Sequence, residues 1–199
     1  MNPIGNLLQK QIEFIKEIDK LKSITRQSMV ADETRNENDA EHSWHLAMMA
    51  MILSKHANGP NLDLMKTVKM VLIHDIVEID AGDTFAYDES GHKDKEEREE
   101  EAARRIYRIL PVGQARECYG LWREFENRET PEAKFAAALD RLQPLLLNYE
   151  TKGHSWKKHG ITSSQVMERN RKIAEGSESL WAYAEQLIAD SVEKGYLLP

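Results

Sequence analysis

The chain has 199 residues, of which 41% are hydrophobic and 31% charged, and its formal net charge is −7. This length is enough for one domain with a substantial core. The negative charge argues against a broad contact with a nucleic-acid polymer, although a local basic pocket could still hold a small phosphorylated ligand. Cys118 is the lone cysteine and cannot form an internal disulfide, which suits a cytoplasmic protein. The longest apolar run, residues 46–53, is too short to cross a membrane.

Apolar residues at helical spacing dominate the first half of the chain. They predict an amphipathic helix over residues 4–21. The polar stretch 23–40 follows as a long loop, and long ordered loops are often functional. A second helix is expected from about 39 to 57, and a third from about 61 into the sequence V-L-I-H-D-I-V-E-I-D-A-G-D.

Helical patterns continue through the second half of the chain. Charged and apolar residues predict helices over 94–110 and 112–126, and Thr130-Pro131 marks the start of a long apolar helix. Residues 151–162 are predicted to form a loop, and residues 164–194 a final helix interrupted near Gly176. Because no segment shows the sustained period-2 alternation of a strand, the sequence predicts an all-α bundle of about seven helices around one core.

His74 and Asp75 stand side by side in an apolar run. A buried carboxylate without a partner costs several kcal/mol, so this pair favours a nearby cation. A divalent metal bound by one nitrogen and one oxygen is the obvious candidate, and a hydrogen-bonded core pair is the alternative. Glu78 lies one turn further on the same side of the expected helix. Gly82 can end that helix, which places Asp83 in the exit loop near the same end.

Two further candidate ligands lie in apolar helices elsewhere in the chain. His42 opens the second helix and Asp140 lies in the long apolar helix, although they could also be a capping histidine and an exposed helical acid. Together with His74 and Asp75 they make a set of two imidazoles and two carboxylates that suits one divalent ion of Mn, Fe, Co, Ni or Zn. Such an ion can activate water and polarise a phosphoryl group.

The same region offers candidates for acid–base catalysis and for substrate binding. Glu78 and Asp83 are the nearby acid/base candidates. Arg26 and Arg35, both from the polar stretch, are suited to clamp phosphate oxygens, and the alternative for each is an ordinary surface arginine.

Three segments in this order, A-E-H-S-W-H, H-D-I-V-E-I-D-A-G-D and A-K-F-A-A-A-L-D-R-L, resemble the HD-domain metal-dependent phosphohydrolases. Within them the chain looks most like the 5′-deoxynucleotidase group, and the resemblance covers nearly all of residues 1–199 as a single domain. The metal-site core would span about 26–150, and a C-terminal helical region 164–194. The resemblance implies four metal ligands, which are His42, His74, Asp75 and Asp140. It also implies that Glu78 is the acid/base residue, that Asp83 is a second catalytic carboxylate, and that Arg26 contacts the phosphate.

We therefore expect a phosphomonoesterase acting on (deoxy)nucleoside 5′-monophosphates, with one divalent ion per chain. The resemblance also implies a homodimer. One alternative is hydrolysis of another phosphoester, such as a cyclic nucleotide, a nucleoside triphosphate or an alarmone. Another is a non-catalytic, metal-dependent nucleotide sensor, but Glu78 and Asp83 favour an enzyme because a binding module needs neither. Bacterial members place a tryptophan near the sugar where this chain has Gln27, so the sugar preference stays open.

Overall fold

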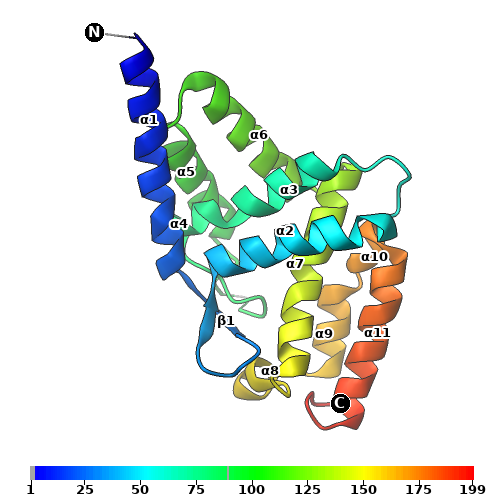
Figure 1. Cartoon of the computed structure of the whole chain (residues 1–199). Helices are drawn as coiled ribbons and strands as arrows, with labels where there is room; N and C mark the ends of the chain where they lie inside the picture. Colours follow the sequence, from blue (N-terminus) through cyan, green and yellow to red (C-terminus); the bar gives the residue numbers. More distant parts are fainter. Residues whose placement is uncertain (1–2, 89) are drawn as a thin grey trace.

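The computed structural model describes residues 3–88 and 90–199, and helices dominate it (Figure 1). The first part of the chain contains helix α1 (Pro3–Ile18), the 3-10 helix η1 (Asp19–Ser23) and the strands β1 (Thr25–Met29) and β2 (Asn36–Asn38). It continues with α2 (Asp39–Leu53), η2 (Ser54–His56), α3 (Leu64–Ile73), η3 (His74–Val77) and α4 (Glu78–Ala81).

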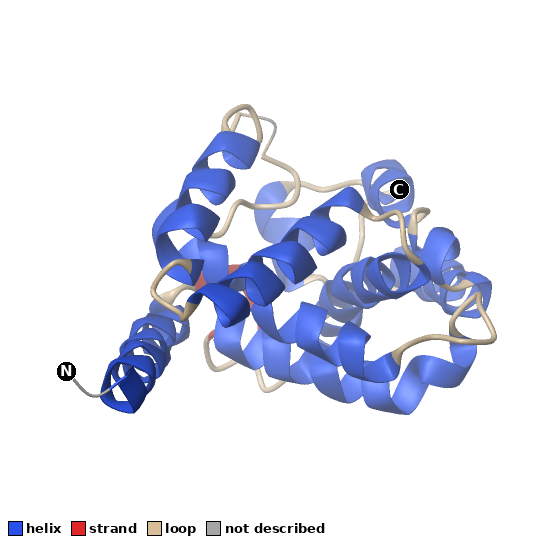
Figure 2. Cartoon of the chain, turned by 90° about the horizontal axis from the view of Figure 1, so that it is seen from above, coloured by secondary structure: helices blue, strands red, loops and turns tan. Residues whose placement is uncertain are grey.

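The remaining elements are all helices. They are α5 (Lys95–Tyr107), α6 (Val112–Asn127), α7 (Pro131–Glu150), α8 (His154–His159), α9 (Ser163–Asn170), α10 (Ile173–Gly176) and α11 (Glu178–Glu193). The predicted all-α class is confirmed, and the two short strands lie among helices (Figure 2). None of the helices in the described ranges is both long and apolar enough to cross a bilayer.

Several segments differ from the sequence prediction. The polar stretch 23–40 is a hairpin rather than a loop, with Thr25 opposite Asn38 and Met29 opposite Asn36. Contacts far apart in sequence support it, because the Asn36 side chain donates a hydrogen bond to the Arg26 carbonyl oxygen at 2.6 Å. The predicted loop 151–162 contains α8, and the predicted final helix is divided into α9, α10 and α11.

The break near Gly176 has a steric reason. At Gly176 a β-carbon would lie 2.3 Å from the carbonyl oxygen of Lys134, so α10 approaches α7 at backbone distance. Only glycine permits this approach without displacing one of the two helices. The chain then turns at Ser177, whose side chain caps α11 by accepting a hydrogen bond from the Leu180 amide.

Predicted start and stop signals place the helices that carry the candidate site. Asn38 and Glu41 form a reciprocal capping box at the start of α2, which fixes the position of the first helical turn and of His42 next to it. Thr130 caps α7 and Pro131 follows at its first position. Gly82 ends α4 with φ 76°, a left-handed conformation that glycine adopts without steric cost.

The third helix ends earlier than expected, at Ile73, and the chain tightens into η3 at His74. The His74 ring nitrogen Nδ1 lies 3.0 Å from the Val71 carbonyl oxygen, which is the acceptor that the Asp75 amide would use if the α-helix continued. Val71 belongs to one buried apolar cluster, and Ile76 and Val77 belong to another. The short turn that carries His74 and Asp75 is thus anchored in both clusters.

Helix α7 lies at the centre of the helical assembly. It packs against α2 and α3, and also against α10 and α11 (Figure 1). Its side chains supply much of the larger apolar cluster, including Phe135, Leu139 and Leu142. Because Asp140 lies between these core residues, its position depends on the packing of the whole helix.

Candidate functional site

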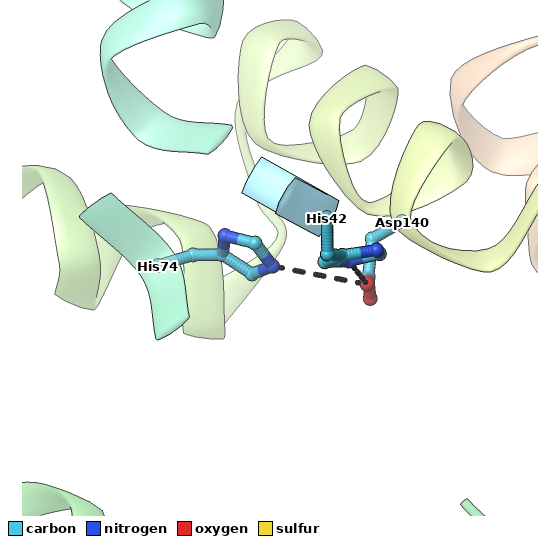
Figure 3. Close-up of side chains that lie close together, drawn as sticks. All are labelled: His42, His74 and Asp140. Atoms are coloured by element: carbon cyan, nitrogen blue, oxygen red, sulfur yellow. Dashed lines mark hydrogen bonds and ion pairs between the residues drawn. The ribbon is translucent and has the colours of Figure 1, made fainter. Parts of the chain in front are cut away.

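Three side chains from separate elements converge at one buried point (Figure 3). His42 comes from α2, His74 from η3 and Asp140 from α7. The Nε2 atom of His42 lies 3.1 Å from Asp140 Oδ1, and the Nε2 atom of His74 lies 3.8 Å from the same oxygen. Asp75 completes the group, with Oδ1 3.1 Å from His74 Nε2 and Oδ2 3.9 Å from His42 Nε2. All four predicted ligand residues are therefore brought together.

Both histidine rings are oriented by acceptors on their far side. Nδ1 of His42 lies 3.0 Å from Gln143 Oε1, and Nδ1 of His74 lies 3.0 Å from the Val71 carbonyl oxygen. Gln143 is itself fixed, because its amide nitrogen donates to Glu37 Oε1 at 2.6 Å. Each Nδ1 must then carry the hydrogen, which leaves each Nε2 directed into the group. Metal-binding histidines show this arrangement.

The electrostatics of this group favour a cation. Burial and the Arg26 charge lower the pKa of His42, but hydrogen bonds to Asp140 and Glu37 outweigh them and raise it to about 9. Burial would raise the pKa of Asp140, yet the hydrogen bond from His42 and the positive charge of both histidines hold it well below the ordinary value. His74 Nε2 is buried without a hydrogen-bond partner. Two imidazoles and two carboxylates around such an atom are a donor set that fits a divalent transition metal.

A second acidic group adjoins the first. Asp39, Glu78 and Asp83 each offer a carboxylate oxygen within 4.8 Å of the others. Arg26 joins the two groups, because its Nη1 donates to Asp75 Oδ2 at 2.9 Å and to Asp39 Oδ1 at 3.1 Å. The predicted acid/base residues Glu78 and Asp83 thus lie beside the predicted ligands.

Burial and mutual repulsion perturb all three of these acids. Burial and the charges of Asp75 and Asp39 raise the pKa of Glu78 well above its ordinary value. Burial and the Asp75 charge raise the pKa of Asp39 to about 6, and burial raises the pKa of Asp83. An acid that keeps its proton near neutral pH can donate it in a reaction.

The sequence analysis did not identify Asp39 as a site residue. An acid at the start of a helix is common because it complements the helix dipole, so its position gave no separate signal. In the structure its side chain is buried and faces Arg26 rather than solvent.

Arg35 is not brought to this site. Its guanidinium forms a two-pronged contact with Glu41, at 2.6 Å and 2.8 Å, and 54% of its side chain is exposed. Glu41 belongs to the capping box at the start of α2 and holds Arg35 on the outer face. Arg26, by contrast, lines the pocket described next.

A pocket of about 320 Å³ opens onto the two acidic groups. Its lining includes the site residues Arg26, His74, Asp75, Glu78, Asp83 and Asp140. Aromatic side chains also line it, namely Phe85, Tyr87, Phe125 and Trp156. Gln27 reaches the same pocket, and its side-chain oxygen lies 3.2 Å from His159 Nε2 of α8.

Three arginines in the pocket lining were also missed from the sequence: Arg128, Arg141 and Arg169. Burial and the charges of Arg128 and Arg169 lower the pKa of Arg141 to about 10. Arg141 directly follows Asp140, but the other two lie in segments with no pattern that pointed to a pocket.

Comparison with known proteins identifies similar sequences and a similar crystal structure. The HD domain family profile matches residues 18–181. The human protein named 5′-deoxynucleotidase HDDC2 is 31% identical over 143 residues, covering 71% of this chain and 68% of its own length. Its Danio rerio counterpart of the same name is 28% identical and covers 86% of this chain and 94% of its own length. A crystal structure from Magnetospirillum magnetotacticum, described as a predicted metal-dependent phosphohydrolase, is 52% identical with a TM-score of 0.95 and full coverage of both chains.

Gln143 provides a test of the hydrogen-bonded chain from Glu37 to His42. We expect Gln143→Leu to lower the free energy of unfolding by about 2–4 kcal/mol in chelator-treated protein, because two buried polar groups lose their partners. Urea unfolding followed by circular dichroism measures this. Gln186→Leu is the matched control, since Gln186 is exposed on α11. Equal stability of the two variants would show that Gln143 does not hold His42.

Proposed function

This chain belongs to the HD-domain family, and from that membership we propose that it is a metal-dependent phosphohydrolase. Its proposed reaction removes the 5′-phosphate from (deoxy)nucleoside 5′-monophosphates. The observation that carries the proposal is the convergence of two imidazole Nε2 atoms on Asp75 and Asp140, beside a buried acid, in one pocket. Relatives named 5′-deoxynucleotidase support the substrate class.

We propose that His42, His74, Asp75 and Asp140 hold one divalent transition ion from the group Mn, Fe, Co, Ni and Zn. When bound, such an ion lowers the pKa of water and polarises a phosphoryl oxygen. The acceptors on Nδ1 of each histidine support this role, because they keep each Nε2 lone pair directed at the ion.

Arg26, Glu78 and Asp83 have separate proposed roles. Arg26 orients Asp75 and Asp39 and lines the pocket, where its guanidinium can donate to phosphate oxygens. Asp83 accepts a proton from the attacking water as the new oxygen–phosphorus bond forms. Glu78 gives its proton to the leaving 5′-oxygen as the old phosphorus–oxygen bond breaks. The products are the nucleoside and inorganic phosphate.

We also propose that the protein is a homodimer and that residues 1–199 form one HD domain. Helix α2 exposes large apolar side chains at spacings of four, seven and eight residues, which places Trp44, Met48, Met51 and Ile52 on one face. α3 packs beside α2 and exposes further apolar side chains, Met65 and Leu72. An exposed apolar face of this kind commonly marks a protein interface, and a second copy offers the same face.

A substitution at Glu78 tests catalysis separately from metal binding. We expect the metal-loaded protein to release inorganic phosphate from nucleoside 5′-monophosphates. We expect Glu78→Gln to lower turnover by about 10²–10⁴-fold, because the glutamine amide has no acidic proton to donate. Glu78→Gln should keep its metal, measured by elemental analysis. Loss of metal from this variant would instead make Glu78 a ligand, and absence of phosphate release from the whole nucleotide panel would contradict the proposed function.

The dimer can be tested by light scattering. We expect a mass of about twice the 22.9 kDa of one chain. Trp44→Glu combined with Ile52→Glu should give a monomer, because a charge placed in an apolar interface is costly. Val112→Glu is the control, since Val112 is 73% exposed but lies on α6 rather than on α2 or α3. A wild-type monomer would overturn the proposed homodimer.

A further inference from the structure

Three arginines line the pocket but have no role in the proposed reaction. Arg128 ends α6, Arg141 lies on α7 and Arg169 lies on α9, so three separate elements bring them together. Arg141 is buried, and Arg128 and Arg169 are partly buried. We call these residues the arginine trio.

Neutral groups hold Arg141 and Arg169 in place. Arg141 Nε donates to the Arg169 carbonyl oxygen at 3.3 Å, and Arg169 Nη1 donates to the Ala86 carbonyl oxygen at 3.3 Å. The Arg169 guanidinium also lies 5.9 Å from the centre of the Tyr87 ring. Arg128 Nε is buried without a hydrogen-bond partner. These contacts orient the guanidinium groups without neutralising them.

No carboxylate among the described residues lies within ion-pair distance of the trio. The arginines that do form ion pairs with acidic residues are Arg26, Arg35, Arg98, Arg104, Arg105 and Arg123. Like charges gathered in a partly enclosed pocket repel one another, because the protein screens them less than water does. An anion bound among them would relieve that repulsion and accept their hydrogen bonds.

Arg128 has a strained backbone at this point. It adopts the left-handed conformation, with φ 55° and ψ 38°, as the residue that ends α6. Glycine or asparagine occupies this conformation at lower cost. An arginine in such a position is explained if its side chain serves the pocket rather than the stability of the fold.

The trio is distinct from the proposed metal centre. Successive residues on an α-helix point about 100° apart, so Arg141 does not follow the direction of Asp140. Asp140 faces His42 and His74, whereas Arg141 reaches the backbone of α9. Arg26 is the arginine that contacts the carboxylates at the metal centre. The side chains of the proposed metal centre and those of the trio therefore have different partners within one pocket.

We propose that the arginine trio binds a second phosphate group on the substrate. This rests on the proposed phosphohydrolase function and specifies its substrate class as nucleoside 5′-phosphates that carry a second phosphate. A nucleoside 5′-monophosphate leaves the trio without an anion once its phosphate lies at the metal centre. The second phosphate could belong to the sugar or to a phosphate chain, because the trio would recognise the same dianionic oxygens in either.

The test compares three adenosine substrates with the metal-loaded protein: AMP, adenosine 3′,5′-bisphosphate and ADP. Cleavage at the 5′-oxygen releases inorganic phosphate from the first two compounds and pyrophosphate from ADP, and each product is measured. We expect at least one two-phosphate compound to exceed AMP in kcat/KM by about tenfold or more, mainly through a lower KM, as charge-assisted contacts predict. Preference for the bisphosphate places the second phosphate on the sugar, and preference for ADP places it in the chain. The advantage should disappear in Arg169→Gln. It should persist in Arg171→Gln, the matched control, because Arg171 is exposed and outside the pocket lining.

Calorimetric binding of the same compounds to chelator-treated protein gives a readout that needs no catalysis. We expect tighter binding of a two-phosphate compound than of AMP, and loss of that difference in Arg169→Gln. Equal kcat/KM and equal binding for all three compounds would overturn the role of the trio while leaving the phosphohydrolase intact. Absence of phosphate release, together with binding that depends on Arg169, would instead overturn the proposed reaction and keep the trio.

Arg128→Asn provides a second variant in which misfolding is not expected. Asparagine suits the left-handed conformation better than arginine, so the melting temperature should stay equal or rise. The preference for the two-phosphate compound should nevertheless fall. A lower melting temperature with an unchanged preference would assign Arg128 a structural role and remove it from the trio.

Discussion

The burial of several acids around one point is the constraint on which the rest of this structure depends. Glu37, Asp39, Asp75 and Glu78 are buried, and Asp140 joins them from α7. Arg26 contacts three of these acids, but a single guanidinium cannot balance the whole group. Transferring carboxylates out of water costs several kcal/mol each unless positive charge compensates. In the absence of another cation the group takes up protons, which explains the raised pKa values of His42, Asp39 and Glu78. A divalent ion would supply the same compensation at higher charge, so its binding would be coupled to folding.

Helix α7 sets the directions of three side chains around this buried group. Asp140 reaches His42, Arg141 turns toward α9, and Gln143 orients the His42 ring from its other side. These three side chains lie within four residues of one another, so the helix sets their directions through its own periodicity. The packing of α7 against α2, α3, α10 and α11 then leaves little freedom for any of them. Asp140 and Arg141 both line the pocket, but they contact different partners although they are neighbours on one helix.

Much of the fold, and the grouping of the candidate ligand residues, could be predicted from local signals. Thr130-Pro131 gave the start of α7, Gly82 gave the end of α4, and His74-Asp75 stood out because charged groups interrupt an apolar run. The hairpin was missed because its strands are polar and pair through contacts that no short window contains. Asp39 and the arginine trio were missed for the same reason, since only the folded chain shows what they face. Arg35 and Arg26 look alike in sequence, and the nearest acid separates them: Glu41 for one, Asp75 for the other.

The central claim is that His42, His74, Asp75 and Asp140 bind one divalent ion in place of the protons that the group otherwise holds. Equilibrium dialysis followed by elemental analysis tests it most directly, with wild-type protein and Asp140→Ala compared across Mn, Fe, Co, Ni and Zn. We expect about one ion per wild-type chain and almost none in Asp140→Ala, because removing one carboxylate from a four-residue set breaks the site. Full occupancy in Asp140→Ala, or no bound divalent ion in the wild type, would contradict the account.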